Sequence, residues 1–587
     1  MVRRGVRGLA AVLILFGSVL LTASAQATVE ETSAPLPLEH LFDNTAVSED
    51  TSPAEADFDG SGASLSAQDL DAAGWTPGRA LTVQGATLTW PDRAAGEPDN
   101  VRADGQSVWL YGTGDALAFL VASTAGDEVT GSGTVAYADG SRSTYVLGAP
   151  DWRRGPLATK AVALPHVNTP GGQLAEKARL YVVTVPVVPG RALASVQLPR
   201  ATDLHVFALS VRTAASGWTG SWATATSGYQ AVGPWTDRTL RLVVHTSAGG
   251  PMVRLRFDNT FAAAPVRIGS ATVAVQRAGA TARGTPVPVT FGRAAGAEVP
   301  AGAQVYSDPL AFDVPAGTNL LVSFHLPGTV PAAPVHRLAQ QRSYLSGPGD
   351  HAADGSAAAY TTVLTNWPLL TGVDVGGGPG SVVVLGDSIT DGDRSTVDAN
   401  RRWPDVLAAR LLSQDVVPHY GVLNQGIGGN RVVTDRYPGD GVSRDTGGVS
   451  ALHRLDRDVH AQTSVRTLIA FEGVNDLLSG STADEVTAGL QEIADRAHAR
   501  GLRVLAGTLL PCGGQAGCTA AVEAERTAVN AWLRDTDVFD DVLDLDAVLR
   551  DPQQPTRLAP AYDSGDHLHP NDAGLAALAH SVDLTLL

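Results

Sequence analysis

The chain has 587 residues, which is too long for a single hydrophobic core, so about three domains are expected. Its formal net charge at pH 7 is -18, an acidic balance that argues against nucleic acid as a partner.

The chain starts with a pattern typical of a secretory signal peptide. Three arginines precede the apolar run 9–21, and residues 23–27, Ala-Ser-Ala-Gln-Ala, follow it with a small-x-small cleavage pattern. The run is too short to cross a bilayer, and we find no later run that is long and apolar enough to do so. We therefore predict a signal peptide over residues 1–27, cleaved near Ala25 to Ala27, and a secreted, extracellular protein without a membrane span.

Two β domains are expected next. Residues 35–215 and 216–375 both consist of short alternating runs bounded by Gly, Pro, Asp and Asn, a pattern that predicts antiparallel β-sandwiches, the second of them jelly-roll-like. The stretch 373–380, which ends in Gly-Gly-Gly-Pro-Gly, then predicts a linker into the catalytic domain.

Several segments of the first β region resemble β modules appended to secreted bacterial carbohydrate-active enzymes. The segments are Phe42-Asp43-Asn44-Thr45, Asp57-Phe58-Asp59-Gly60 and Gly74-Trp75-Thr76-Pro77-Gly78. The resemblance implies a carbohydrate or cell-wall setting. Turn residues surround Trp218, Trp222 and Trp235, so we expect these rings to be exposed and able to stack on sugars.

The last domain, residues 381–587, alternates strands with helices. Strands are expected at 382–385, 421–423, 467–470, 502–506 and 542–545, and helices at 402–412, 449–461, 484–500, 519–534 and 571–582. Alternation of this kind predicts an α/β domain with a parallel sheet of about five strands, flavodoxin-like in winding, with helices on both faces.

A candidate nucleophile follows the first of these strands. Residues 381–392 read Ser-Val-Val-Val-Leu-Gly-Asp-Ser-Ile-Thr-Asp-Gly. The β-branched run is typical of a strand buried on both faces, so the polar turn after it lies at the carboxyl end of the sheet. Ligands bind at this edge in open α/β sheets, which places the hydroxyl of Ser388 for chemistry.

A serine needs a base, and the base needs a third group to orient it. The segment 564–571 supplies both, because Asp566 and His569 are three residues apart and one turn brings their side chains together. Oxyanion donors are offered by the backbone of the glycine-rich stretch 424–430 and by the side-chain amide of Asn475.

In order and approximate spacing, these four stretches resemble the GDSL or SGNH hydrolase superfamily, from about residue 382 to the C-terminus. The motif here ends in Ile-Thr where the family name has Leu, which leaves the nucleophile untouched. The resemblance identifies Gly429 as the oxyanion glycine, with Gly428 as the alternative. It implies an oxyanion hole built from Ser388, Gly429 and Asn475, and a secreted serine esterase that needs no metal or organic cofactor.

The two cysteines, Cys512 and Cys518, lie in one glycine-rich loop that follows the expected strand 502–506. Outside the cell such a pair predicts a local disulfide, here one that stiffens the rim of the active edge.

Three alternatives remain. His567 and His569, flanked by Asp566 and Asp572, also suit a metal site, although their spacing matches no recognised ligand pattern. The second is a non-catalytic wall- or carbohydrate-binding protein with a vestigial hydrolase domain. The third concerns the substrate: the β domains favour acetyl groups on carbohydrate, and lipid or short-chain esters are the runner-up.

Overall fold

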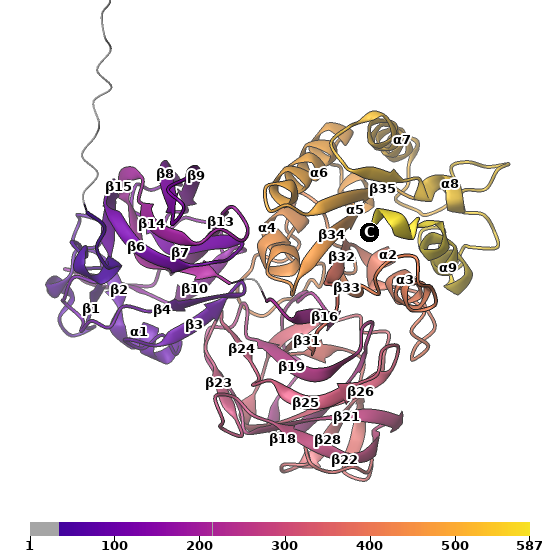
Figure 1. Cartoon of the computed structure of the whole chain (residues 1–587), viewed down its shortest axis with the longest axis horizontal. Helices are drawn as coiled ribbons and strands as arrows, with labels where there is room; N and C mark the ends of the chain where they lie inside the picture. Colours follow the sequence, from indigo (N-terminus) through magenta and orange to yellow (C-terminus); the bar gives the residue numbers. More distant parts are fainter. Residues whose placement is uncertain (1–33, 214) are drawn as a thin grey trace, which may run out of the picture.

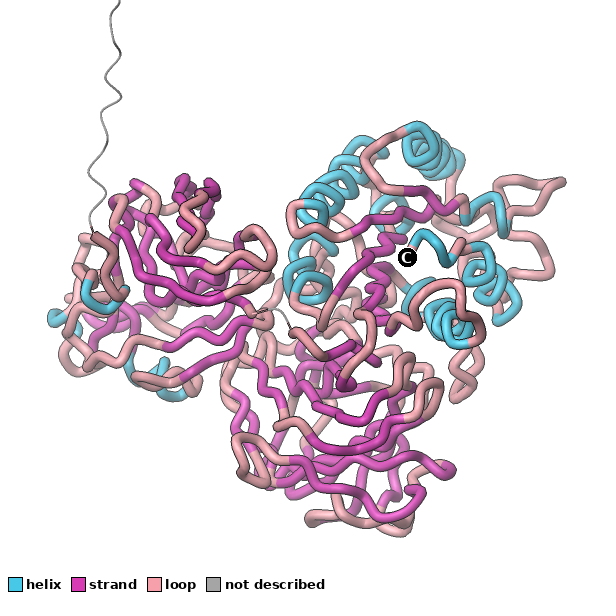
Figure 2. The backbone as a smooth tube through the Cα atoms, viewed as in Figure 1, coloured by secondary structure: helices cyan, strands magenta, loops and turns pink. Residues whose placement is uncertain are grey.

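The computed structural model describes residues 34–213 and 215–587, which form three lobes (Figure 1). The predicted signal peptide, residues 1–27, lies outside the described residues. Figure 2 shows strands throughout the first two lobes, whereas the third has helices around a central sheet. No helix in the described part of the chain is long and apolar enough to cross a membrane.

The first lobe is an antiparallel β-sandwich, as predicted. One sheet has the order β10-β13-β7-β15-β5 and the other β6-β14-β8-β9. Apolar side chains from both sheets, among them Phe119 and Tyr145, share one core. The strands are β5 (Val101–Asp104), β6 (Ser107–Gly112), β7 (Ala116–Ser123), β8 (Val129–Tyr137), β9 (Arg142–Ala149), β10 (Lys160–Leu164), β13 (Ala178–Pro186), β14 (Leu193–Gln197) and β15 (Arg200–Arg212).

A smaller subsheet with the order β1-β2-β11-β12 adjoins this sandwich, next to one short helix. These elements are β1 (Val47–Ser48), β2 (Ser64–Ser66), α1 (Ala67–Ala72), β11 (Val167–Thr169) and β12 (Gly172–Leu174).

A hairpin from the first β region belongs to the sheet of the second. Strands β3 (Ala80–Val83) and β4 (Ala86–Thr89) continue the order β16-β31-β19-β24, because Thr82 pairs with Gln304 of β24. Nearby, the indole of Trp75 donates a hydrogen bond to the carbonyl of Ala301 at 2.9 Å. The two β lobes are therefore joined by a shared sheet as well as by the chain.

The second lobe packs this sheet against another with the order β22-β21-β26-β18-β28-β29, around a large apolar core. Its strands are β16 (Trp218–Ala223), β17 (Gly228–Gln230), β18 (Trp235–His245), β19 (Gly250–Asp258), β20 (Val266–Ile268), β21 (Ser270–Ala278), β22 (Thr281–Val289), β23 (Ala297–Val299), β24 (Gln304–Tyr306), β25 (Leu310–Val314), β26 (Asn319–Val330), β27 (Ala333–His336), β28 (Ser343–Pro348), β29 (Tyr360–Leu364), β30 (Trp367–Pro368) and β31 (Leu370–Gly376).

The expected exposure of the tryptophans is wrong for two of three residues. Trp222 is 7% exposed and Trp235 is 4% exposed, and both belong to the core of this lobe. Trp218 is half-buried under the guanidinium of Arg254, which lies 4.6 Å from its ring centre. These rings fill space between sheets and stack on charged side chains, so they offer no open platform for a sugar.

The third lobe is the predicted α/β domain. Its sheet has the order β33-β32-β34-β35-β36 and all four pairings are parallel, which is the flavodoxin-like winding. Two separate apolar clusters cover the two faces of the sheet. The strands are β32 (Ser381–Gly386), β33 (Gly421–Gly426), β34 (Val465–Phe471), β35 (Arg503–Gly507) and β36 (Asp541–Leu543).

The expected helices are present, with additional short ones after the strands. They are α2 (Ser388–Asp391), α3 (Trp403–Leu412), α4 (Ala451–Leu455) continued by a π-helical turn (Asp456–His460), α5 (Val474–Leu478), α6 (Ala483–His498), α7 (Ala520–Asp535), α8 (Leu545–Leu549) and α9 (Asp572–Ser581). The candidate residues therefore lie where predicted, after strands or in the last loop.

Both β lobes contact the α/β domain. The only two lysines of the chain, Lys160 and Lys177 of the first lobe, both reach the segment Gly439–Asp440 of the α/β domain. In the second lobe, Arg256 donates to the side-chain oxygen of Gln462 at 2.9 Å. The α/β domain is thus held by both of the domains that precede it.

Candidate active site

Ser388 is the first residue of the short helix α2, at the carboxyl end of strand β32, which lies between β33 and β34 in the sheet. Asp387 caps this helix, and its carboxylate accepts a hydrogen bond from the NH of Ile389 at 2.9 Å. The turn requires glycine at 386, because a Cβ there would come within 2.3 Å of Thr390 Oγ1. A strand that ends in a tight, capped turn fixes the direction of the serine hydroxyl.

His569 lies beside this hydroxyl, although the two residues are 181 positions apart. Its Nε2 is 2.8 Å from Ser388 Oγ, and its Nδ1 is 2.8 Å from Asp566 Oδ2. A carboxylate only accepts hydrogen bonds, so Nδ1 carries the proton and Nε2 is free to accept the serine proton. The geometry is that of a nucleophile, a general base and an orienting carboxylate.

Asp566 is ionised over a wide pH range. Burial acts to raise the pKa of this carboxyl, but hydrogen bonds from the NH and the ring of His569 and from the NH of Leu568 outweigh it and hold the pKa well below its usual range. Arg394 also donates to its Oδ2, at 3.1 Å. The negative charge needed to stabilise an imidazolium is therefore present at any pH near neutrality.

The structure separates the two candidate oxyanion glycines. The NH of Gly428 donates to Asp391 Oδ2 at 2.8 Å and is therefore already engaged, which favours Gly429. Gly429 has a φ of +79°, and a Cβ there would lie 2.2 Å from Arg436 Nη1. Arg436 in turn donates to the carbonyl of Gly429 at 3.0 Å, which fixes the orientation of this peptide.

The amide of Asn475, on α5, points into the same region. Its Nδ2 donates to the carbonyl of Asn430 at 3.0 Å and to Asp387 Oδ2 at the longer distance of 3.4 Å. The first bond orients the amide, and the second is weak enough to be exchanged for a substrate oxyanion. The predicted donors Ser388, Gly429 and Asn475 thus come from the ends of three adjacent strands.

Replacing Asn475 with alanine is expected to lower kcat by about 10²–10³-fold, because one oxyanion donor is lost. KM for a p-nitrophenyl ester should change little, since the donor acts mainly on the transition state. Steady-state kinetics measure both. A control is Ser479→Ala, at the end of the same helix, which should keep full activity; an Asn475→Ala enzyme as active as this control would contradict the assignment.

Arg454, a fully buried arginine on α4, is a further residue of the site that was not predicted from the sequence. It donates to the carbonyls of Gly386 and Gln425 at 3.0 and 2.6 Å, and lies 3.4 Å from Glu472 Oε2. One guanidinium therefore ties together the ends of β32, β33 and β34, from which the active site is built. Its sequence gives little signal, because an arginine on an amphipathic helix usually lies in solvent.

The remaining acidic residues near the site support the loops. Asp476, beside Asn475, accepts from the NH groups of Val432 and Val433 at 2.8 and 3.0 Å. Burial is the main cause that raises the pKa of Asp387, to about 6, opposed by the NH of Ile389 and by His569. Asp387 is thus partly protonated near pH 6 and is fully charged only at higher pH.

The rim next to the reacting pair is polar. Asp393 Oδ2 lies 3.7 Å from His569 Nε2, and the side chains of Arg394 and His567 are 55% and 46% exposed. Cys512 and Cys518 form the expected disulfide. A Cβ on Gly514, inside this bridged loop, would lie 3.0 Å from the ring of His567, so the loop packs against the rim.

The metal alternative does not match this geometry. His567 Nδ1 is bonded to Asp563 at 2.6 Å, whereas Asp572 accepts from Thr396 and Arg401. Among the described residues, the only close group of possible ligand side chains is Cys512, Cys518 and Glu523, and both of its sulfurs are in the disulfide. The histidines and carboxylates of segment 563–572 therefore have separate partners.

A flavodoxin-like sheet that carries Ser, His and Asp together with three oxyanion donors defines a serine-dependent ester hydrolase. Residues 384–577 match the model of the GDSL-like lipase/acylhydrolase family. The C-terminal domain belongs to this family and is a carboxylic ester hydrolase. Residues 31–215 match an AziU2-like β-sandwich domain.

Several solved structures resemble 34–35% of this chain. They include TesA (21% identity, 35% of this chain and 99% of that chain, TM-score 0.26). A catalytic mutant of the acetylxylan esterase Axe2 from Geobacillus stearothermophilus has 20% identity over 34% of this chain and 91% of that chain, TM-score 0.26. A member of the lipolytic G-D-S-L family from Veillonella parvula has 18% identity over 34% and 94%, TM-score 0.24. A search of curated proteins found no match.

Proposed function

We propose that the protein is an extracellular esterase that removes acyl groups, acetyl in particular, from carbohydrate. The observation that carries the substrate class is the polar rim: the half-buried Asp393 and the exposed Arg394 and His567 lie beside the reacting pair. Charged side chains suit the hydroxyl-rich surface of a sugar, whereas a long acyl chain needs an apolar surface to bind. The signal peptide expected from the sequence and the disulfide support an extracellular location.

In the proposed mechanism, His569 takes the proton of Ser388 as its oxygen attacks the ester carbonyl. Asp566 holds the imidazole in the required tautomer and stabilises its cation. The oxyanion accepts hydrogen bonds from the NH groups of Ser388 and Gly429 and from the amide of Asn475. His569 then protonates the leaving alcohol, and the acyl group remains as an ester on Ser388. Water attacks this ester while His569 takes its proton, and His569 returns the proton to Ser388 as the carboxylic acid is released.

The alternative, a non-catalytic binding protein with a vestigial hydrolase domain, has less support. The nucleophile, the base, the orienting carboxylate and the oxyanion donors are all residues that can perform these roles. Ser388 and His569 are already at hydrogen-bond distance. A domain that had lost its activity would be under no constraint to keep this spacing across 181 residues.

The substrate is tested by comparing acetyl release from acetylated xylan with hydrolysis of p-nitrophenyl acetate and p-nitrophenyl palmitate. We expect acetate release from the polysaccharide and a kcat/KM for the acetyl ester at least about 100-fold above that for palmitate, since the charged groups beside the reacting pair suit a short acyl group better than a long apolar chain. Preference for palmitate, with no release from the polysaccharide, would instead establish a lipase.

A further inference from the structure

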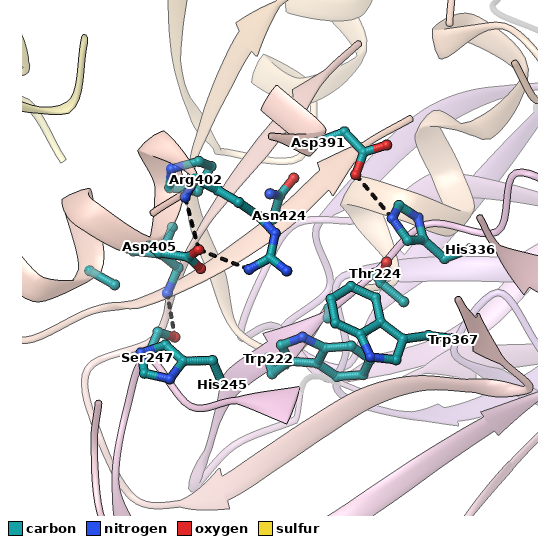
Figure 3. A pocket seen from close by; sticks show the side chains of 14 residues that line it. Trp222, Thr224, His245, Ser247, His336, Trp367, Asp391, Arg402, Asp405 and Asn424 are labelled. Carbon is teal, nitrogen blue, oxygen red and sulfur yellow. Dashed lines mark hydrogen bonds and ion pairs between the residues drawn. The ribbon is translucent and has the colours of Figure 1, made fainter. Parts of the chain in front are cut away.

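A histidine of the second β lobe reaches the back of the catalytic loops. His336, the last residue of β27, is 4% exposed, and its Nε2 lies 3.0 Å from Asp391 Oδ1 in the α/β domain (Figure 3). Its ring stacks on Trp367 of the same lobe, with the ring centres 5.5 Å apart. The adjoining cavity measures about 30 Å³, which admits water but no substrate, so this contact is part of a packed domain interface.

The hydrogen-bond partners of His336 require it to be charged. Nδ1 lies 2.9 Å from the carbonyl of Ala225, and Nε2 lies 3.2 Å from the carbonyl of Leu338 as well as close to the Asp391 carboxylate. All three partners only accept hydrogen bonds, so both ring nitrogens must donate. His336 is therefore a buried imidazolium paired with a carboxylate.

The surroundings agree with this assignment. Burial acts to lower the pKa of His336, but the charge and hydrogen bond of Asp391 and the two carbonyls outweigh it and raise the pKa. The other titratable or charged groups that line the same cavity are His245, Arg402 and Asp405, and the last two are paired at 2.8 Å. Asp391 is thus the group that balances the imidazolium.

Asp391 connects the two parts of the oxyanion hole. It is the last residue of α2, the helix that Ser388 begins, and its Oδ2 accepts the NH of Gly428 at 2.8 Å. One carboxylate therefore joins the helix that carries the Ser388 NH to the loop that presents the NH of Gly429. The oxygen that faces His336 is the other one, Oδ1, so the two hydrogen bonds hold the carboxylate from opposite sides.

We propose that His336 is a positioning residue for ester hydrolysis: by fixing Asp391 it sets the spacing between the backbone donors of Ser388 and Gly429. The second β lobe then completes the catalytic unit, since it supplies a group on which the geometry of the oxyanion hole depends. Misplacing a catalytic donor by about 1 Å can cost about 10²-fold in rate.

The test compares His336→Ala and His336→Gln with Thr463→Val in the full-length protein. Thr463 donates across the same interface to Asp374 at 2.8 Å, but it precedes β34, at the opposite edge of the sheet from Ser388. With p-nitrophenyl acetate we expect His336→Ala to lower kcat about 10–100-fold with KM within about twofold of wild type. His336→Gln, which keeps one donor, should recover part of the rate, and Thr463→Val should keep full kcat.

A double-mutant cycle separates positioning from general destabilisation. Asp391→Ala and the double variant with His336→Ala should be equally slow, because both changes act through one carboxylate. Losses that multiply in the double variant would overturn the proposal. So would a His336→Ala enzyme that keeps wild-type kcat, or one whose loss is no greater than that of a Thr463→Val protein with the same melting temperature.

Discussion

Alanine at Ser388 or at His569 is expected to lower kcat for p-nitrophenyl acetate by about 10⁵–10⁶-fold, because nucleophile and base act as one unit. The double variant should be no slower than either single variant. His569 Nε2 and Ser388 Oγ are 2.8 Å apart, so removing either partner removes the whole proton-transfer path. Steady-state kinetics, corrected for spontaneous ester hydrolysis, measure the loss.

His567→Ala is the matched control for this prediction. His567 is two residues from His569 and carries its own carboxylate partner, Asp563, at 2.6 Å. We expect this variant to keep most of the activity. Equal losses from the two histidine variants, or recovery of either by added zinc, would show that the base has been misassigned.

Replacing Arg454 with methionine is expected to lower the free energy of unfolding of the α/β domain by about 3–5 kcal/mol. The variant leaves Glu472 buried without its paired arginine, at a point where three strand ends meet, and Asp458 keeps only Arg457 of its two arginine partners. A residue that joins the ends of β32, β33 and β34 also orders the active site, so activity should fall in the same variant. Thermal or denaturant unfolding of the full-length protein measures the stability change.

Arg401→Met provides the comparison, because Arg401 also pairs with a carboxylate but its side chain is 59% exposed. Exposed pairs contribute about 0–1 kcal/mol, so this variant should be close to wild type. If Arg454→Met were no less stable than Arg401→Met, the buried guanidinium would not hold the loops together.

The α/β domain was predictable because its sequence signals are local. The apolar strand 382–385 is followed at once by the Gly-Asp-Ser turn, and Asp566 and His569 lie in one loop. Parallel strands bring their carboxyl ends to one edge whatever the length of the connections. The proximity of Ser388 and His569 could therefore be predicted from the order of strands and motifs along the chain, without knowledge of any long-range contact.

Predictions failed where the answer depends on packing between distant segments. Turn residues around Trp222 and Trp235 suggested exposure, but the strands that carry them line the core of the second lobe. The hairpin 80–89 adds to a sheet built from residues more than a hundred positions later.

His336 and Arg454 were missed for a related reason. An isolated histidine in a β region and an arginine on a helix carry no local sign of burial. Their roles follow only from the partners that the fold brings to them, Asp391 in one case and three strand ends in the other.

Ester hydrolysis at this site requires that Ser388 be an activated nucleophile. The most direct measurement is reaction of the folded wild-type protein with a fluorophosphonate probe, followed by mass spectrometry of its peptides. We predict a single covalent adduct on Ser388, formed rapidly in the wild type and absent in His569→Ala over the same time. A folded wild-type protein that forms no adduct, or forms it on another residue, would contradict the proposed chemistry.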